Sequence, residues 1–341
     1  MPILSIERSA PVDPGVEPGI RLSIVGYDAG AADLLAIRNA NRETPRDTGY
    51  FDWRYRGQPA AHPPVVVLAE HWSGERIGAL SMIPRDYLVD GARCSLGVLG
   101  DLSVSAPWRG RGLAGRMLRY AAESDVARGW AASVVLTDEA AAGSLERSGW
   151  RTVTRLRRYA ATALSHRLAG LAAVFGAQTT PLTWEVTDTF DRRFDEFWHA
   201  LDKTDAIIAS RTANDLAWRY GRHPIDRYQC WIARQDALVG YVIFRLDGRR
   251  VAIDDLLCRD GERGAARLLR QFMPWAQSEA GVASWSIRVN ERHRVTRALS
   301  RCGFFPRRDA LRLMVHPLED GRAARLLTPA AWWLTAGDKD V

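Results

Sequence analysis

A short stretch of the chain alternates arginines with glycines: PWRGRGLAGRML, residues 107–118. A strand-like segment, Leu102-Ser103-Val104, comes just before it, and an apolar helical pattern follows directly. The first N–H groups of a helix have no acceptor within the helix, and they carry a partial positive charge. Glycine has no Cβ, so an anion can approach these groups, while Arg109 and Arg111 add charge at the rim. The stretch therefore predicts a cradle for a phosphate or pyrophosphate.

Two common phosphate-binding loops are excluded by the surrounding sequence. No Gly-Lys-Ser/Thr follows the glycines, so the stretch is not a P-loop. The strands before it are predicted to form an antiparallel meander over 63–72, 76–89 and 94–105, which is not the βαβ unit of a dinucleotide fingerprint. The remaining predicted elements are a strand at 21–27, helices at 28–43 and 111–128, a strand at 132–137, a helix at 140–149 and a strand at 150–161.

The second half of the chain repeats the landmarks of the first half in the same order. Phe51-Asp52-Trp53-Arg54-Tyr55 corresponds to Leu216-Ala217-Trp218-Arg219-Tyr220, and each is followed within a few residues by a proline. RIGALSMI corresponds to LVGYVIFR, GVLGDLSV to VAIDDLLC, and LERSGW to LSRCGF. Because four matches come in one order with similar spacing, the sequence predicts a duplicated domain.

The segment LSVSAPWRGRGLAGRML resembles motif A of the GCN5-related N-acetyltransferases (GNAT), whose pattern is Arg/Gln-x-x-Gly-x-Gly/Ala after a strand. Arg109, Gly112 and Ala114 match the pattern, and Gly110 matches its common Arg-Gly start. The later LERSGW resembles the family's Leu-Tyr-Glu-Lys-x-Gly-Phe segment. The resemblance covers residues 20–160 by motif, and residues 185–315 by order and repeat alone.

The resemblance implies an α/β (α+β) fold of two tandem GNAT-like domains, each a mixed, largely antiparallel twisted sheet flanked by helices. The expected divisions are a flexible N-terminus at 1–19, a first domain with the acyl-CoA site at 20–162, a connecting helix and linker at 163–181, a degenerate second domain at 182–317 and a docked tail at 318–341. Trp332 and Trp333 are expected to dock the tail onto a domain surface.

The family implies acetyl-CoA or another acyl-CoA as co-substrate, and no metal. Backbone N–H groups would hold the pyrophosphate, and the Val104 backbone would bond the pantetheine arm, which adds to the sheet like a short strand. The expected cofactor-binding residues are Leu102, Ser103, Val104, Arg109, Gly110, Arg111, Gly112, Leu113 and Ala114.

Acyl transfer to an amine needs a proton acceptor, an oxyanion donor and often an acid for the thiolate. Asp101, on the strand before the cradle, is the candidate base, although its repeat counterpart Asp255 favours a role in the fold instead. The family's usual acid is a Tyr, and this chain has Leu145 there. Tyr159 is the candidate replacement, with Tyr120, a Ser or water as alternatives. Asp138, at the start of the following helix, is expected to cap it.

The segment 43–62 is where the acceptor-binding helix and loop of such folds lie. Arg54, Tyr55 and Trp72 are candidate acceptor-binding residues, whereas Trp53 and Trp218 are expected to anchor the core. In the second half the cradle is replaced by a shorter loop with two acids, Arg259-Asp260-Gly261-Glu262. This half is therefore expected not to bind CoA well. It is expected to pack on the first domain and to form a wall of the acceptor groove.

Composition sets the class of protein. The chain has 341 residues and a formal net charge of +7, which suits an anionic cofactor. The arginines are dispersed and no nucleic-acid-binding motif accompanies them, so no nucleic acid is expected. The four cysteines form no C-x-x-C pair, and no run approaches a membrane span or a signal peptide. A cytoplasmic protein, monomeric or homodimeric and without membrane contact, is the expectation.

Three hypotheses follow. The first is an N-acyltransferase that moves an acetyl or other acyl group to an amine of a small molecule, for example an amino sugar. The second is a non-catalytic acyl-CoA-binding regulatory protein, which the missing Tyr and the degenerate second half favour. The third is an N-acyltransferase that uses acyl-carrier protein as its donor, because that carrier presents the same phosphopantetheine arm.

Overall fold

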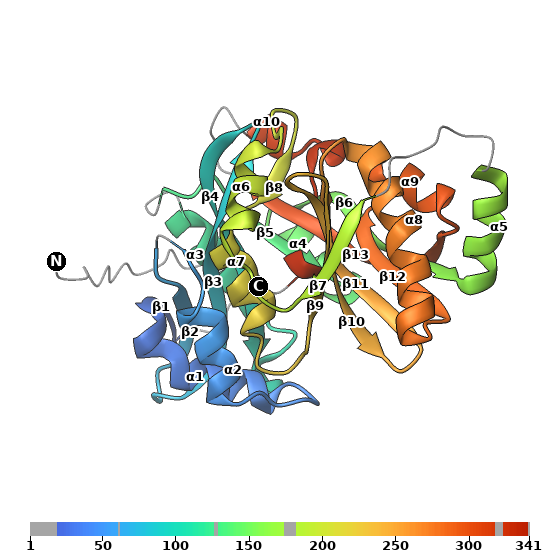
Figure 1. Cartoon of the computed structure of the whole chain (residues 1–341). Helices are drawn as coiled ribbons and strands as arrows, with labels where there is room; N and C mark the ends of the chain where they lie inside the picture. Colours follow the sequence, from blue (N-terminus) through green and yellow to red (C-terminus); the bar gives the residue numbers. More distant parts are fainter. Residues whose placement is uncertain (1–18, 61, 126–128, 174–181, 318–322, 340–341) are drawn as a thin grey trace.

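The elements of the first half follow the order that the sequence predicts. The computed structural model describes residues 19–60, 62–125, 129–173, 182–317 and 323–339, so the predicted flexible N-terminus lies almost wholly outside them (Figure 1). The first half comprises β1 (Ile20–Gly26), α1 (Tyr27–Ala40), α2 (Thr48–Phe51), the π-helix η1 (Asp52–Arg56), β2 (Val65–His71), β3 (Arg76–Val89), β4 (Ala92–Val104), η2 (Ala106–Trp108), α3 (Leu113–Asp125), β5 (Ala132–Thr137), α4 (Glu139–Arg147) and β6 (Arg151–Thr162).

The second half runs through a matching series after α5 (Ala163–Ala173), the helix expected to connect the two. It comprises β7 (Thr183–Thr187), α6 (Arg192–Ala200), β8 (Ile207–Ala209), α7 (Ala213–Leu216), the π-helix η4 (Ala217–Gly221), β9 (Gln229–Arg234), β10 (Leu238–Asp247), β11 (Arg250–Cys258), α8 (Gly261–Ala280), β12 (Ser284–Asn290), α9 (Val295–Arg301) and β13 (Phe305–Pro317). The tail contains α10 (Ala323–Leu326), η5 (Pro329–Ala331) and η6 (Ala336–Asp338).

The strands of both halves join one mixed sheet in the order β1-β2-β3-β4-β5-β13-β6-β12-β11-β10-β9-β7, with β8 added beside β3. The meander β2-β3-β4 is antiparallel, as the sequence predicts. The sequence did not predict that the two halves exchange their last strands at the centre of the sheet. The last strand of each half pairs with the penultimate strand of the other: β13 with β5, and β6 with β12. The two halves are consequently joined by backbone hydrogen bonds as well as by side-chain packing.

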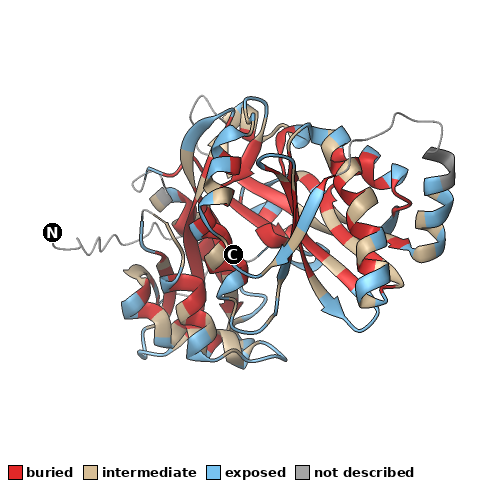
Figure 2. Ribbon diagram, viewed as in Figure 1, coloured by how far each residue is buried: buried red, intermediate tan, exposed pale blue. Residues whose placement is uncertain are grey.

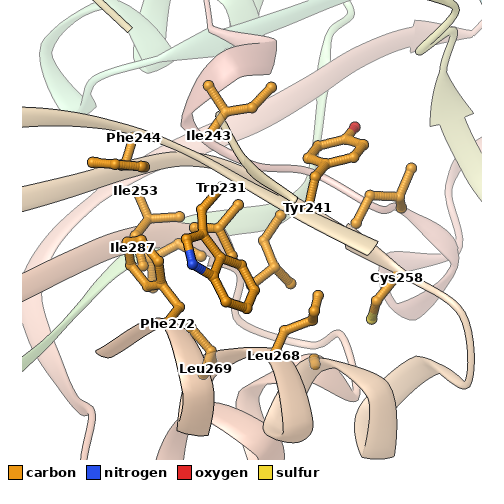
Figure 3. Close-up of a cluster of buried hydrophobic side chains, with 14 of the residues drawn as sticks. Trp231, Tyr241, Ile243, Phe244, Ile253, Cys258, Leu268, Leu269, Phe272 and Ile287 are labelled. Carbon is orange, nitrogen blue, oxygen red and sulfur yellow. The ribbon is translucent and has the colours of Figure 1, made fainter. Parts of the chain in front are cut away.

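Helices cover both faces of the sheet because successive residues of each strand point to opposite sides. On β2, Val66 and Leu68 face the core under α1, whereas Val67 and Ala69 face the core under α3 and α4. In the second half the apolar side of α8, with Leu268, Leu269 and Phe272, packs on β9–β12 (Figure 3). In Figure 2 buried positions lie along the strands of both halves and on α8.

The repeated Trp-Arg-Tyr segments meet each other across the two halves. Each forms a π-helical turn, closed by a bond from Gly57 N to Asp52 O in the first half and from Arg222 N to Ala217 O in the second. The Trp53 Nε1 donates to the Trp218 backbone oxygen at 2.7 Å, and the Trp218 Nε1 donates to the Trp53 oxygen at 2.7 Å. The rings stack with centroids 5.5 Å apart. The prediction that both tryptophans are core anchors is confirmed.

Replacing Trp218 by Phe should destabilise the protein by about 2–4 kcal/mol, because it leaves the buried Trp53 carbonyl unpaired and opens a void. The free energy of unfolding, measured with urea, tests this. Trp72→Phe is the matched control, since Trp72 is 78% exposed and should change the stability by less than about 0.5 kcal/mol. Equal effects of the two substitutions would contradict the anchoring role.

Candidate functional site

The strands β4 and β5 run side by side for only two residue pairs, Gly97–Ser133 and Val98–Val134. Beyond Val98, β4 continues for six residues to Val104, and β5 continues for three residues beyond Val134 to Thr137. No pairing joins these continuing segments. The two strands therefore separate toward the end of β4 that leads into the arginine-glycine stretch, and they leave backbone groups on both facing edges open to a ligand.

The eight residues 105–112 connect β4 to α3. Gly110 and Gly112 have φ angles of +74° and +76°, which side chains rarely adopt, and a Cβ at either would have no neighbour within 4 Å. The loop is thus open on the side where an anion would sit. It leads into the 13-residue helix α3, whose first N–H groups at Leu113 and Ala114 have no acceptor within the helix. The predicted cradle residues are together at one place.

The backbone of Val104 faces the separated side of the sheet. Ser105 N donates to Ile77 O on β3, so the alternation of a strand turns the Val104 N–H and C=O toward β5. This orientation suits an extended amide ligand. The Val104 carbonyl, however, already accepts a bond from Arg109 Nε at 3.1 Å, and Arg109 also bonds Asn41. A ligand on this edge would use the N–H, or displace the Arg109 side chain.

Asp101 lies where β4 bulges beside these features. The register between β3 and β4 shifts at this point, and Asp101 has a φ of +47°, which is unusual for a residue with a side chain. Its carboxylate, 8% exposed, is 3.3 Å from both Arg38 Nε and Arg54 Nη1. Tyr55 donates its hydroxyl to Asp101 Oδ2 at 2.5 Å and lies 2.7 Å from Ser81 Oγ.

The electrostatics of this cluster argue against proton transfer by Asp101. Burial alone would raise its pKa, but the charges of Arg54 and Arg38 and the Tyr55 bond outweigh burial, so the pKa lies below its usual value. A carboxylate with a lowered pKa is a weak base at neutral pH. The arrangement instead makes Asp101 a fixed anion that holds two arginines and a tyrosine. The predicted role as general base loses its support.

The predicted acceptor-binding residues are not brought together. Arg54 is 4% exposed and Tyr55 1% exposed, so both present little surface to a ligand. Their contacts with Asp101 instead support the β4 bulge. Gly100 allows this, because a Cβ there would lie 2.6 Å from the Arg54 guanidinium. Trp72 lies in the turn between β2 and β3, beside His71, whose ring also contacts Trp108 of the cradle loop. It belongs to the neighbourhood of the loop and is separate from Arg54 and Tyr55.

Tyr159 is not at the site, so its prediction as the acid is wrong. It lies on β6 and packs in the core of the second half. The strand exchange places β5 and β13 between β4 and β6, which separates their axes by about 14 Å at a usual strand spacing. At the family's Tyr position, Leu145 is buried against α3 in an apolar cluster. Asp138 caps α4 by accepting from Ala141 N, as predicted.

Three residues of the site were missed by sequence reasoning. Arg38, in the last turn of α1, reaches Asp101, and Asn41 just after that helix reaches Arg109. Ser81 on β3 meets Tyr55. The only available signal was the arginine that follows the apolar run Leu34–Ile37 of α1, and neither its target nor the other two contacts could be found from spacing.

The second half has the same strand separation but a different loop. The strands β11 and β12 pair from Arg250–Ser284 to Ile253–Ile287 and then continue without pairing to each other. Only two residues, Arg259 and Asp260, connect β11 to α8, against eight in the first half. As the sequence predicted, this loop is shorter, and it offers fewer backbone groups to a phosphate.

The C-terminal segment 332–339 fills the gap between β11 and β12. Thr335 bridges to Val289, and its Oγ1 donates to Asp255 Oδ1 at 3.1 Å. Leu334 O accepts from Asn290 N. A Cβ at Gly337 would lie 1.8 Å from the Tyr220 hydroxyl oxygen, so only glycine fits there.

This segment is embedded more deeply than a docked tail. Trp332 is fully buried and donates to Leu326 O, and Asp338 pairs with the buried Arg211 at 2.7 Å. The repeat counterpart of Asp101, Asp255, is also ion-paired with Arg211, so the two counterparts share a buried, paired state. The expectation of surface docking is therefore corrected, because both tail tryptophans join the core.

Other site types find no support within the described ranges. No group of three or more His, Cys, Asp and Glu there is placed to hold a metal ion. None of the helices that the structure describes is long and apolar enough to cross a membrane. The four cysteines are free thiols, and Cys230, Cys258 and Cys302 are buried.

Solved structures share this architecture. A GCN5-related N-acetyltransferase from Anabaena variabilis ATCC 29413 matches with a TM-score of 0.65 at 13% identity, over 86% of this chain and 72% of that one. A tandem GNAT protein from the clavulanic acid biosynthesis pathway matches with a TM-score of 0.54 at 14% identity, over 88% and 100%. Saccharomyces cerevisiae N-myristoyltransferase, solved with bound myristoyl-CoA, matches with a TM-score of 0.53 at 10% identity, over 91% and 85%.

The chain therefore has the fold of the GNAT N-acetyltransferases, in its tandem form. No protein-family model matches the sequence, and no curated protein matches it. At these identities the similarity defines the fold alone.

Replacing Asp101 by Asn should destabilise the protein by about 3–5 kcal/mol, because the buried Arg54 and the partly buried Arg38 lose their shared anion. The folded-state pKa of Asp101 is lowered, so its stabilisation is complete above the unfolded-state pKa of about 4 and is lost as the pH falls through the folded-state pKa. The difference between wild type and Asp101→Asn, measured by urea unfolding, should therefore shrink below about pH 4.

Asp28→Asn is the control, since Asp28 is an exposed partner of Arg56 and should contribute less than about 1 kcal/mol. A stability of Asp101→Asn equal to that of wild type at neutral pH would show that the cluster does not hold the bulge.

Proposed function

We propose that the first half of this protein transfers an acyl group from acyl-CoA to an amine of a small molecule. The observation that carries the proposal is the coincidence of two features. The strands β4 and β5 separate where the open Gly110–Gly112 loop meets the N-terminus of α3. The separated strands suit an extended amide chain, and the loop suits a pyrophosphate, so together they fit the two parts of a CoA molecule.

The residues of the first half take distinct parts in this reaction. The N–H groups at the start of α3 would hold the pyrophosphate, with Arg109 and Arg111 at its rim. The Val104 N–H would bond the pantetheine arm. The cluster around Asp101 is a positioning device: it holds the β4 bulge rigid beside the thioester, where the acceptor amine would attack the carbonyl carbon and expel the thiolate. Leu145 provides no proton for that thiolate, so the proton that the amine loses would reach the thiolate through water.

The second half would bind no CoA. Its loop is two residues long, and its own C-terminal segment lies between the strands where a pantetheine arm would enter. The proposal therefore includes one acyl-CoA per chain.

Calorimetric titration of acetyl-CoA should give one site per wild-type chain. Gly112→Trp should weaken this binding by about 100-fold or more, equivalent to ~2.8 kcal/mol, because the new side chain fills the cradle and strains its backbone. Gly248→Trp is the matched control. Gly248 also has a positive φ and open space around it, but lies in the turn between β10 and β11.

Loss of binding in both glycine variants would indicate a general folding defect, which thermal unfolding would reveal. Two equivalent sites in wild type would contradict the division of roles between the halves. If acetyl-CoA did not bind and acetyl-acyl-carrier protein bound tightly, the donor would be acyl-carrier protein and not acyl-CoA.

An amine panel tests the reaction itself. Wild type with acetyl-CoA should release free thiol, measured with a thiol reagent, at least about tenfold faster with one class of small amine than with none. The panel should contain amino sugars, amino acids, polyamines and a lysine peptide. Gly112→Trp should abolish the amine-dependent release.

Acetylation of the lysine peptide alone would overturn the small-molecule assignment. Binding of acetyl-CoA without release for any amine would favour the non-catalytic, regulatory reading.

A further inference from the structure

A cavity of about 300 Å³ opens on the side of the second half opposite the α8 face. Asp254 of β11 and Arg288 of β12 line it from the two separated strands, and Gly337 of the C-terminal segment closes it. Arg46 and Tyr50 line it from the first half. The cavity is thus the part of the gap between β11 and β12 that the C-terminal segment 332–339 leaves open.

Cationic side chains dominate the wall. Five of them line the cavity, against two carboxylates. The cations are Arg46, Arg219, Arg245, Arg288 and Lys339. The two carboxylates, Asp226 and Asp254, are both ion-paired with Arg245, at 3.0 and 2.8 Å. Both lining carboxylates are therefore committed to Arg245, and of the other cations Arg288 is ion-paired with Asp309 at 2.6 Å.

Two of these cations lack full compensation. No described carboxylate lies within ion-pair distance of Arg46, and its Nε makes no hydrogen bond; its guanidinium lies 4.8 Å from the centre of the Tyr50 ring. Arg219 is 3% exposed and lies 3.5 Å from Asp338, but its Nε and Nη1 make no hydrogen bond. A guanidinium with unused donors favours an anion, above all a carboxylate that can accept two parallel bonds.

Aromatic rings supply the rest of the wall. His223 contacts Trp53 edge-on at 4.4 Å and Tyr228 at 5.4 Å between ring centres, and all three line the cavity with Tyr50. The His223 Nδ1 accepts the Asp226 N–H, which places the proton of the neutral ring on Nε2, and burial lowers the pKa of the ring. Ring faces beside guanidinium groups suit a flat ligand.

We propose that this cavity binds a small aromatic carboxylate. The carboxylate would meet Arg46 and Arg219, and the ring would lie among Tyr50, Trp53, His223 and Tyr228. The volume is at the lower end of known ligand sites, which limits the ligand to one ring with short substituents. The site is separate from the cradle, and no thioester can reach it, because the C-terminal segment occupies the strand gap. It therefore binds without transferring a group.

The location couples this site to the first half. Arg46, Tyr50 and Trp53 stand just before Arg54 and Tyr55, which hold the β4 bulge through Asp101. Trp53, which lines the cavity, is also hydrogen-bonded to Trp218 of the second half. An occupied cavity would accordingly stabilise the contact between the halves.

Benzoate and benzamide are the probes, because they share shape and differ in charge. Calorimetric titration of the full-length protein should detect benzoate binding, and benzamide should bind at least about tenfold more weakly. Arg46→Gln should weaken benzoate binding by a similar factor. Arg42→Gln, which removes an exposed arginine outside the cavity, should leave it unchanged.

Equal affinity for benzoate and benzamide, or unchanged benzoate binding in Arg46→Gln, would overturn the proposal. So would the absence of benzoate binding at millimolar concentration. Gly112→Trp separates this test from the acyl-CoA site, because it should lose acetyl-CoA binding and keep benzoate binding. Loss of both ligands in that variant, with its thermal unfolding unchanged, would show that the two sites are one and would overturn the proposal.

Discussion

The paired tryptophans Trp53 and Trp218 are the contact on which the two halves depend. Each indole donates to the backbone carbonyl of the other, so neither half can satisfy its own π-helical turn without its counterpart. The exchanged strands β6 and β13 add the same mutual dependence at the level of the sheet. A duplicated chain has in this way become one cooperative unit, in which the cradle, the bulge and the second strand gap have fixed relative positions.

Corresponding tyrosine and aspartate residues of the two halves have different charged and hydrogen-bonding partners. In the first half Tyr55 bonds Asp101, which two arginines hold as an anion next to an open strand gap. In the second half Asp255 turns to Arg211 and Thr335, and the Tyr220 hydroxyl is left against Gly337 without a hydrogen bond. The difference arises from the C-terminal segment, which supplies polar groups and a filling volume that the first half lacks.

The bulge in β4 and the length of the loop after it together determine the shape of the gap between β4 and β5. The bulge at Asp101 shifts the register against β3, and the long loop allows α3 to begin away from the sheet edge. In the second half a two-residue loop draws α8 close to β11, where a Cβ at Gly264 would collide with the Arg259 carbonyl. The longer loop allows the β4–β5 gap, and not the β11–β12 gap, to accommodate a phosphate. The C-terminal segment 332–339 fills most of the β11–β12 gap, whereas the β4–β5 gap stays open.

The sequence by itself determined the local features of this protein. Helix and strand periodicity located β2, β3, β5 and α3, and glycines beside arginines marked the cradle, because each of these signals depends on neighbours within a few residues. The ordered repeat of such local landmarks revealed the duplication. Only the tertiary structure decided which strands pair across the halves, that Arg38 reaches Asp101, that Tyr159 lies far from the site, and that the chain end enters the second gap. Those outcomes depend on contacts between residues that are distant in the chain, and no spacing in the sequence encodes them.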